Sequence, residues 1–221
     1  MKQIKLLFLL ASASVTGVFA QSNGLTDMSQ SRYAKMANTG INAVHWTNGF
    51  WGERFNVFSG TSLQSMWNTW NTPEVSHGFR NFEIAAGVCK GEHWGPPFHD
   101  GDMYKWMEGV ASVYAVNKDP ELDKLMDNFI ACVVKAQRAD GYIHTPVVIE
   151  ELNKGIDSHT LADSQQQTVI GTKVGAEDEK GAFANRLNFE TYNLGHLMMA
   201  GIVHRRATGK TTLFDAAVKA T

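Results

Sequence analysis

A helix–tight turn–helix pattern that occurs twice along the chain is the feature that most constrains the fold. In its first copy, apolar side chains recur every three or four positions over residues 102–117 and again over 120–134, which is the spacing of an amphipathic α-helix. Asp119 predicts the N-cap of the second helix, and Gly141 of the Asp140-Gly141 pair predicts its end. Because a short turn joins the two helices, we expect them to form an antiparallel αα-hairpin.

The second copy of the pattern lies near the end of the chain. Residues 188–207 predict a helix that Gly209 ends, and Thr211 or Thr212 caps a following helix. The first helix of this pair is apolar nearly all round, as expected of a helix that is buried on both sides, such as one in the inner wall of a double-layered helical ring. The fold class is therefore predicted to be all-α and built of αα-hairpins.

The rest of the chain is less regular. Two further helices are predicted over residues 61–71 and 74–90, and residues 43–46 indicate a short N-terminal β-strand before an Asn-Gly turn. Residues 21–42 are polar and unpatterned, which predicts a loose leader. Between the two hairpins, residues 142–187 show little periodicity and predict a long loop with solvated stretches.

Residues 1–20 have the parts of a signal peptide. Lys2 and Lys5 accompany an apolar stretch that closes on the small-x-small pattern at residues 18–20. We expect cleavage before Gln21 and export to the periplasm or the extracellular space, with an uncleaved membrane anchor as the alternative. No later stretch approaches ~18 apolar residues, so no membrane contact is expected after cleavage.

Charge and composition argue against a nucleic-acid partner and are typical of a protein that acts on carbohydrates. Twenty basic and 22 acidic residues give a formal net charge of −2, and the basic residues are scattered, so no nucleic-acid partner is expected. Six Trp and twelve Phe residues suit a carbohydrate-active protein, because sugars stack their C–H faces on aromatic rings. Cys89 and Cys132 could form a disulfide in an exported protein, whereas the apolar helix side that carries Cys132 favours a buried free thiol. Two cysteines so far apart do not make a zinc site.

Five segments, in order along the chain, carry a resemblance to glycoside hydrolase family 127, which holds the β-L-arabinofuranosidases. The most informative is similar to the family's Phe-x-Asp-Ser-Asp-Val-Tyr-Lys-Trp-Leu-Glu segment, and the match extends from residue 43 to the end of the chain. The segments are NGFW at 48–51, FHDGDMYKWME at 98–108, DGYIHTP at 140–146, ETYNLGHL at 190–197 and ATGK at 207–210.

The resemblance implies that residues 43–221 are the N-terminal part of an (α/α)6-barrel catalytic domain, which β-sandwich domains follow in the family. It also implies a glycosidase whose nucleophile is a cysteine thiolate held on zinc, with a glutamate as general acid/base. Those groups belong to segments beyond Thr221, so we assign this chain no catalytic residue, no metal ligand and no bound cofactor. The last predicted helix reaches Thr221 without a C-cap, and we interpret the chain as truncated and inactive alone.

The resemblance also indicates substrate-binding residues at the start of the helix over 188–207. Phe189 stands where the family has a His that contacts the sugar, which replaces a hydrogen-bonding ring with an apolar one, so arabinofuranose need not be the sugar. Helical spacing puts Tyr192, Asn193 and His196 on the same side as Phe189. Glu190 is offset from them and could brace the helix.

Four residues outside that helix are further candidates. Asp100 and Asp102 either cap the helix over 102–117 or bind sugar hydroxyls. His144 lies after a helix end and either lines the pocket or lies on the surface. His99 is the fourth candidate for substrate binding.

Three functions remain open from the sequence. The first is an exported, β-L-arabinofuranosidase-like glycosidase that releases non-reducing-end sugars from plant-type glycans. The second is another exported (α/α)6 hydrolase or lyase, and the third is a non-catalytic carbohydrate-binding or scaffold fragment. The expected partner is an oligosaccharide or a glycoside.

Overall fold

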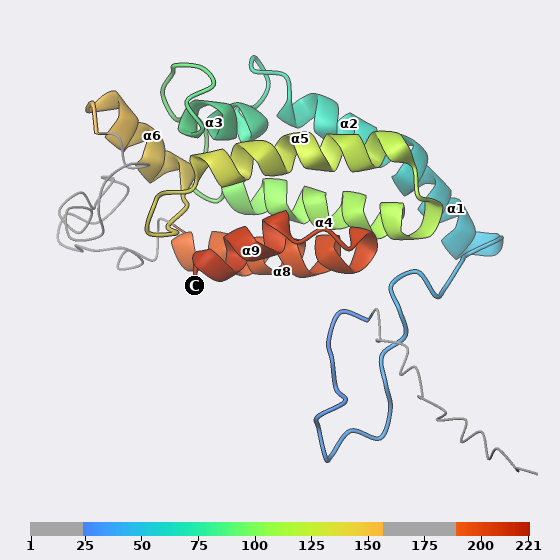
Figure 1. Ribbon diagram of the computed structural model, residues 1–221. Helices are drawn as coiled ribbons and strands as arrows, with labels where there is room; N and C mark the ends of the chain where they lie inside the picture. Colours follow the sequence, from blue (N-terminus) through green and yellow to red (C-terminus); the bar gives the residue numbers. More distant parts are fainter. Residues whose placement is uncertain (1–23, 157–188) are drawn as a thin grey trace, which may run out of the picture.

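Helices make up all the regular structure in the part of the chain that is described (Figure 1). The computed structural model describes residues 24–156 and 189–221. None of these residues lies in a β-strand, so the predicted all-α class is confirmed. The elements are α1 (Gly49–Val57), the π-helical η1 (Phe58–Ser62), α2 (Leu63–Trp70), α3 (Gly78–Ala85), α4 (His99–Asn117), α5 (Pro120–Ala136), α6 (Thr145–Asn153), α8 (Glu190–Thr208) and α9 (Thr212–Lys219).

Both predicted hairpins are present and lie side by side. Only Lys118 and Asp119 separate α4 from α5, and the Asp119 side chain accepts a hydrogen bond from the Glu121 N–H at 2.9 Å, which confirms the predicted N-cap. α8 ends at Thr208 with Gly209 as its left-handed C-cap, as predicted, and α9 follows after a short turn. α4 packs along the length of α8, and α5 contacts both α4 and α9 (Figure 1).

The predicted N-terminal β-strand at residues 43–46 is wrong. These residues form no regular structure, and helical structure instead begins at Gly49 and continues through η1 to Trp70. A strand needs a neighbouring strand to pair its backbone groups, and the described residues supply none. The alternating pattern around Val44 and Trp46 therefore has no partner strand among the described residues.

The long loop predicted over residues 142–187 is wrong in its first part, where α6 forms. Pro146 occupies a first-turn position, and Val148 and Ile149 are buried where α6 packs on α3. A run of consecutive buried residues from Thr145 to Ile149 has no helical period, so the sequence pattern did not reveal this helix. Residues 157–187 of the predicted loop lie outside the described residues.

The predicted N-cap of α4 is also wrong. The helix begins at His99 with Phe98 as its N-cap residue, and no side chain accepts a capping hydrogen bond there. Asp100 and Asp102 both lie within the first turn, where a negative charge still interacts favourably with the helix dipole. Their side chains are therefore available for other partners.

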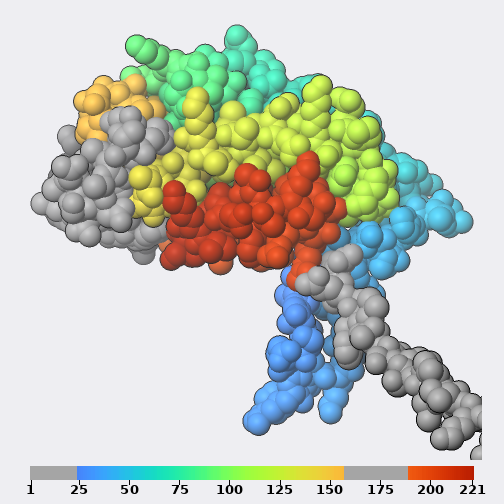
Figure 2. Space-filling model, in the orientation of Figure 1, coloured from blue at the N-terminus to red at the C-terminus, as the bar shows by residue number. Residues whose placement is uncertain are grey.

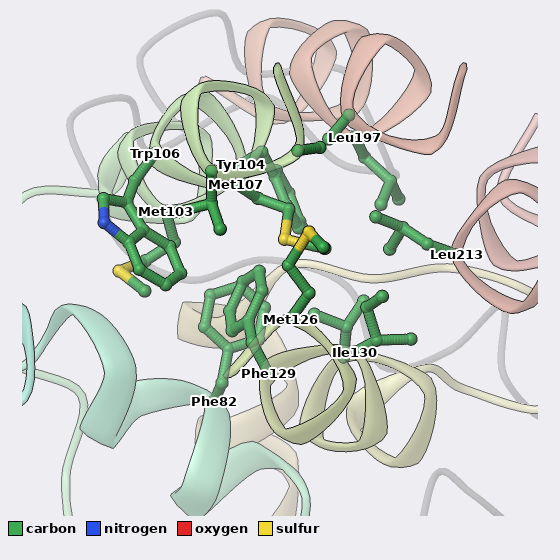
Figure 3. Close-up of a cluster of buried hydrophobic side chains, with 14 of the residues drawn as sticks. Phe82, Met103, Tyr104, Trp106, Met107, Met126, Phe129, Ile130, Leu197 and Leu213 are labelled. Carbon is green, nitrogen blue, oxygen red and sulfur yellow. The ribbon is translucent and has the colours of Figure 1, made fainter. Parts of the chain in front are cut away.

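A single core cluster fills the space between the helices (Figure 3). Phe82 from α3, Trp106 from α4, Phe129 from α5 and Leu197 from α8 are each no more than 1% exposed. The rings of Phe82 and Phe129 meet edge to face with their centroids 5.1 Å apart. Trp106 donates its indole N–H to the Leu63 carbonyl at 3.2 Å, so its one polar atom is satisfied within the core.

Both cysteines are free and half-buried against this core. Burial raises the pKa of the Cys89 and Cys132 thiols above the ordinary value. Both groups are therefore protonated at neutral pH, which makes them poor nucleophiles.

Part of the segment over residues 24–47 extends away from the helical body (Figure 2), whereas Ile41 packs against the core. These residues form turns and irregular structure, and the predicted loose leader over residues 21–42 stays a prediction. The predicted signal peptide at residues 1–20 lies outside the described residues. In the described ranges, no helix combines the length and the apolar composition that crossing a membrane requires.

The end of α9 packs closely on the turn that follows α5. α5 ends at Ala136, earlier than predicted, and Gly141 lies in the next turn with φ 96°. A Cβ on Gly141 would lie only 2.0 Å from the Lys219 carbonyl oxygen. Gln137 donates through Nε2 to the carbonyls of Gly141 and Ala216, at 2.7 and 2.8 Å. This turn therefore fixes the position of α9.

We expect Gly141→Ala to lower the free energy of unfolding by about 3 kcal/mol, because an L side chain is strained at this φ and α9 must also shift. Gly87→Ala is the matched control, since Gly87 also has positive φ (65°) but has no atom within 4 Å of the added Cβ. The control should cost only about 1 kcal/mol. Urea unfolding followed by circular dichroism measures both variants. Equal losses would show that the contact with α9 contributes nothing.

Candidate functional site

A buried polar cluster, formed by Asp100, His144, Thr145 and Asn193, lies where α4, α6 and α8 begin. The Asp100 carboxylate is 1% exposed and accepts hydrogen bonds from the Thr145 N–H at 2.7 Å and the Thr145 hydroxyl at 2.6 Å. His144 Nδ1 lies 3.5 Å from Asp100 Oδ2. Burial raises the pKa of the Asp100 carboxyl, but His144 and Thr145 outweigh it, so the pKa lies below its ordinary value. The ionised Asp100 therefore holds the start of α6 against α4.

Asn193 connects this cluster to α8. Its Oδ1 accepts a hydrogen bond from the Gly101 N–H at 2.9 Å, and its Nδ2 donates to the Pro97 carbonyl at 2.9 Å. Nδ2 also lies 3.3 Å from His144 Nδ1. His144 Nδ1 accepts from Asn193 when the ring carries its proton on Nε2, and donates to Asp100 when the proton is on Nδ1. Asn193 is 2% exposed, and its amide is occupied by backbone groups that precede and begin α4.

Ionisable and aromatic side chains lie at the surface along α4 and α8, and we call this set the α4–α8 wall. On α4, Lys105 Nζ is 2.7 Å from Asp102 Oδ1 and donates to the Tyr192 hydroxyl at 2.7 Å. One turn further, His196 Nδ1 lies 3.4 Å from Glu108 Oε1. The members of the wall are Asp102, Lys105, Glu108, Tyr192 and His196.

The pKa shifts differ between the Lys105–Asp102 pair and the Glu108–His196 pair of the wall. Burial lowers the pKa of Lys105, but its hydrogen bonds to Asp102 and Tyr192 outweigh this effect, so the pKa lies above its ordinary value. Burial raises the pKa of the Glu108 carboxyl, and His196 and Lys105 only partly offset this. Glu108 therefore keeps its proton to a higher pH than an exposed glutamate.

An aromatic rim, formed by the rings of Phe98, Phe189 and Tyr192, lies at the end of the wall where α8 begins. Ring centroids are 5.4 Å apart for Phe98 and Phe189, and 6.0 Å apart for Phe189 and Tyr192, with edge-to-face geometry in both pairs. The Phe189 side chain is 36% exposed. Its backbone is left-handed (φ 59°, ψ 21°), a conformation that costs a bulky residue about 1 kcal/mol or more. A sugar could stack on this rim through its C–H groups.

Glu190 has the bracing role that its offset position predicts. The Tyr142 hydroxyl donates a short hydrogen bond to Glu190 Oε1. Burial raises the pKa of Tyr142 well above its ordinary value, and the Glu190 carboxylate raises it further. This contact ties the turn after α5 to the first turn of α8.

His99 lies apart from the other predicted residues. Its ring packs edge to face on Trp70 of α2, with centroids 5.9 Å apart, and lies directly against Gly95. Burial lowers the pKa of His99, and it lowers that of the nearby His93 to about 4. Both rings are therefore neutral at neutral pH.

An apolar hollow lies at the opposite end of α4. It has a volume of about 780 Å³ and opens between the segment before α1 and the last two turns of α4. Its lining is mostly apolar and holds no ionisable side chain, so it offers no group for acid–base chemistry. The lining residues are Leu25, Thr26, Asn38, Thr39, Gly40, Ile41, Val44, Trp46, Phe55, Phe58, Ser112, Val113 and Val116.

Residues 24–156 and 189–221 contain no group of three or more His, Cys, Asp or Glu side chains that could hold a metal ion. The resemblance places the zinc ligands beyond Thr221. The zinc expectation therefore stays a prediction about that segment, and no step through a metal follows from the residues described here.

Comparison with known proteins identifies the family of the part of the chain that contains the site. The family described as "Beta-L-arabinofuranosidase, GH127 catalytic domain" matches residues 43–221. The chain belongs to this family. The match includes both α4 and α8, whose sequence segments carried the resemblance to this family.

Individual relatives agree with this assignment. A non-reducing end β-L-arabinofuranosidase from Bifidobacterium longum subsp. longum is 31% identical over 144 residues, which are 65% of this chain and 18% of that protein. A solved GH127 β-L-arabinofuranosidase from Geobacillus stearothermophilus T6 is 31% identical with a TM-score of 0.62, over 80% of this chain and 24% of that one. A solved glycoside hydrolase is 65% identical with a TM-score of 0.55, over 90% of this chain and 22% of that one. The chain thus spans about a fifth to a quarter of the length of these relatives.

The structure sorts the eight predicted substrate residues of this GH127 chain by their surroundings. Those on the wall or rim can reach solvent, those in the polar cluster are buried, and one lies near α2; their roles in sugar binding stay predictions. The first group is Asp102, Phe189, Tyr192 and His196, the second is Asp100, His144 and Asn193, and the third is His99.

Sequence reasoning missed three residues that shape the site. Lys105 was not assigned to binding, although its spacing of three residues from Asp102 is a signal for an ion pair on one helix face. Thr145 gives no such signal, because 45 residues separate it from Asp100. Gly101 gives none either, since its contact with Asn193 spans 92 residues.

Replacing Asp100 should destabilise the protein in a pH-dependent way. We expect Asp100→Asn to lower the free energy of unfolding by about 2 kcal/mol at neutral pH, because a Thr145 donor loses its acceptor. Since the folded pKa of Asp100 lies below 3.8, this difference should be constant above about pH 5 and shrink as the pH falls through the folded pKa. Denaturant unfolding at pH 2 to 8 measures it.

Asp102→Asn is the control, because Asp102 forms only a surface ion pair and should change stability by less than about 1 kcal/mol. A loss for Asp100→Asn that persists unchanged below pH 3, or equals that of the control, would contradict the role of the buried charge.

Proposed function

We propose that the protein is an exported glycosidase that releases a sugar from the non-reducing end of a glycan, and that the α4–α8 wall and the aromatic rim form one side of its sugar site. The observation that carries the proposal is the GH127 match across residues 43–221. The chemistry of the wall supports it. Carboxylates and Lys105 can hydrogen-bond sugar hydroxyls, and the rings of the rim can pack on sugar C–H faces.

The proposal includes a partial (α/α)6-barrel with α4 and α8 in the inner layer. The two helices run parallel, since Asn193 meets Gly101 at their first turns and Lys118 Nζ donates to the Ala207 carbonyl at 2.7 Å at their far ends. α5 follows α4 and α9 follows α8 along the chain, and these two helices also contact each other. Two adjacent hairpins with parallel first helices are the repeating unit that a double-layered helical ring requires.

In this proposal the residues described here bind and orient the sugar. No nucleophile is assigned among them, since Cys89 and Cys132 are half-buried and protonated. The groups that break the glycosidic bond, and the zinc ligands, would lie beyond Thr221. The chain alone would therefore be inactive.

The sugar itself is proposed to differ from arabinofuranose at the position that faces Phe189. The relatives from Bifidobacterium and Geobacillus are β-L-arabinofuranosidases. Here Phe189 offers no hydrogen bond, and its edge-to-face packing on Phe98 and Tyr192 makes this part of the site apolar. We therefore expect a sugar that presents C–H groups, not a hydroxyl, to Phe189, within a plant-type glycan.

Restoring the family's residue tests the proposed function. In the full-length protein, Phe189→His should raise kcat/KM for a β-L-arabinofuranoside about tenfold, the value of one added hydrogen bond to the sugar. The wild type should cleave another glycoside better, as measured across a panel of chromogenic glycosides. Histidine also tolerates the left-handed backbone better than phenylalanine does.

Phe50→His serves as the control, because Phe50 is an exposed phenylalanine on α1, away from the wall, and should leave both activities unchanged. A full-length wild type that cleaves no glycoside would refute the glycosidase proposal. A wild type that already cleaves β-L-arabinofuranosides as well as its relatives do would show that the missing His is dispensable.

Export is tested separately by the mature N-terminus. Expression in a bacterial host with intact secretion should give a product that starts at Gln21, as measured by mass spectrometry of the exported fraction. Ala20→Arg should block this cleavage, because signal peptidase needs a small residue there. Retention of residues 1–20 by the exported wild type would contradict the prediction.

A further inference from the structure

Gly101 lies in an unusually close contact between α4 and α8. A Cβ at this position would lie 2.7 Å from Tyr192 Cε1 and 2.7 Å from Asn193 Oδ1. Real side chains do not approach so closely, so any other residue at position 101 forces at least one neighbour to move. Glycine in a helix is about 1 kcal/mol less favourable than alanine. The close contact with Tyr192 and Asn193 explains why a glycine is present within α4 despite this cost.

Tyr192 is the neighbour that can move. Asn193 is 2% exposed, and its amide is held by the Gly101 N–H and the Pro97 carbonyl. The Tyr192 side chain is 40% exposed, so it has free space on its solvent side. A Cβ at position 101 would therefore push the Tyr192 ring outward.

The position of the Tyr192 ring determines several contacts of the sugar site. Its hydroxyl accepts a hydrogen bond from Lys105 at 2.7 Å, and its ring meets the edges of Phe189 and His196 with centroids 6.0 and 4.7 Å away. An outward shift would break the Lys105 bond and remove the support of the Phe189 ring. The wall and the rim would then both lose their geometry.

We propose that Gly101 is a positioning residue for the sugar site: its lack of a Cβ lets the Tyr192 ring lie against α4, where Tyr192 orients Lys105 and supports Phe189. This inference rests on the proposed glycosidase function for its effect on activity. The packing itself does not depend on that function.

Gly101→Ala in the full-length enzyme tests the inference, with the glycoside that the wild type cleaves best as substrate. We expect KM to rise about tenfold while kcat changes less than about threefold, because the wall and the rim hold the sugar equally in the bound substrate and in the transition state. Gly60→Ala is the control, since Gly60 also lies in helical structure and nothing lies within 4 Å of its added Cβ. It should leave both constants unchanged.

A double variant separates positioning from a general loss of stability. Tyr192→Ala removes the ring that a Cβ at position 101 would displace, so adding Gly101→Ala to Tyr192→Ala should change KM less than about twofold further. This double variant removes the crowding by the Tyr192 ring and keeps the contact with Asn193 Oδ1, so it should fold more readily than Gly101→Ala alone. Independent, additive effects of the two substitutions on KM would overturn the proposal.

Fluorine NMR of the protein labelled with 3-fluorotyrosine gives a readout that needs no activity. The Tyr192 resonance, assigned as the one that Tyr192→Phe removes, should shift in Gly101→Ala and stay in place in Gly60→Ala. An unshifted resonance in Gly101→Ala would overturn the inference. If the wild type cleaves no glycoside but the resonance shifts, the proposed function fails while the positioning of Tyr192 by Gly101 stands.

Discussion

The side-chain amide of Asn193 is the contact on which the arrangement of the site depends. It binds the first turn of α4 through the Gly101 N–H and the preceding segment through the Pro97 carbonyl. Because Asn193 itself lies in the first turn of α8, these two bonds align the starts of both helices. The parallel course of α4 and α8 then brings Tyr192 beside Lys105 and His196 beside Glu108. The positions of the wall residues therefore depend on the buried Asn193 amide and on its contact with Gly101.

Asp100 and Asp102 have different roles because one is buried and the other is not. They are two positions apart, so they point to different sides of α4. Asp100 faces inward, where a carboxylate without partners would be very unfavourable, and two bonds from Thr145 compensate its burial. Asp102 faces outward and pairs with Lys105 at the surface. Of the two, Asp102 alone has an accessible charge that a sugar could meet.

The sequence predicted those parts of the fold that short-range patterns determine. The α5 helix and its Asp119 cap were predicted correctly, because the apolar spacing and the capping residue lie within a few positions of each other. α6 was missed and the strand at residues 43–46 was wrong, because burial on α3 and the absence of a partner strand among the described residues are tertiary facts. The same limit applies to the site: the side of α8 that carries Tyr192 and His196 followed from helical spacing, whereas the bonds of Asp100 to Thr145 did not.

Phe189 illustrates how a local departure can alter a site without altering its fold. The family resemblance implies an exchange of His for Phe at this position, but it does not predict the left-handed backbone that Phe189 adopts before α8. That conformation disfavours a bulky side chain, and the edge-to-face contacts with Phe98 and Tyr192 help to offset the cost. The contacts that hold α8 in place belong to Asn193 and Glu190, not to Phe189. Position 189 is therefore free to determine the chemistry of the rim while the helices behind it stay in register.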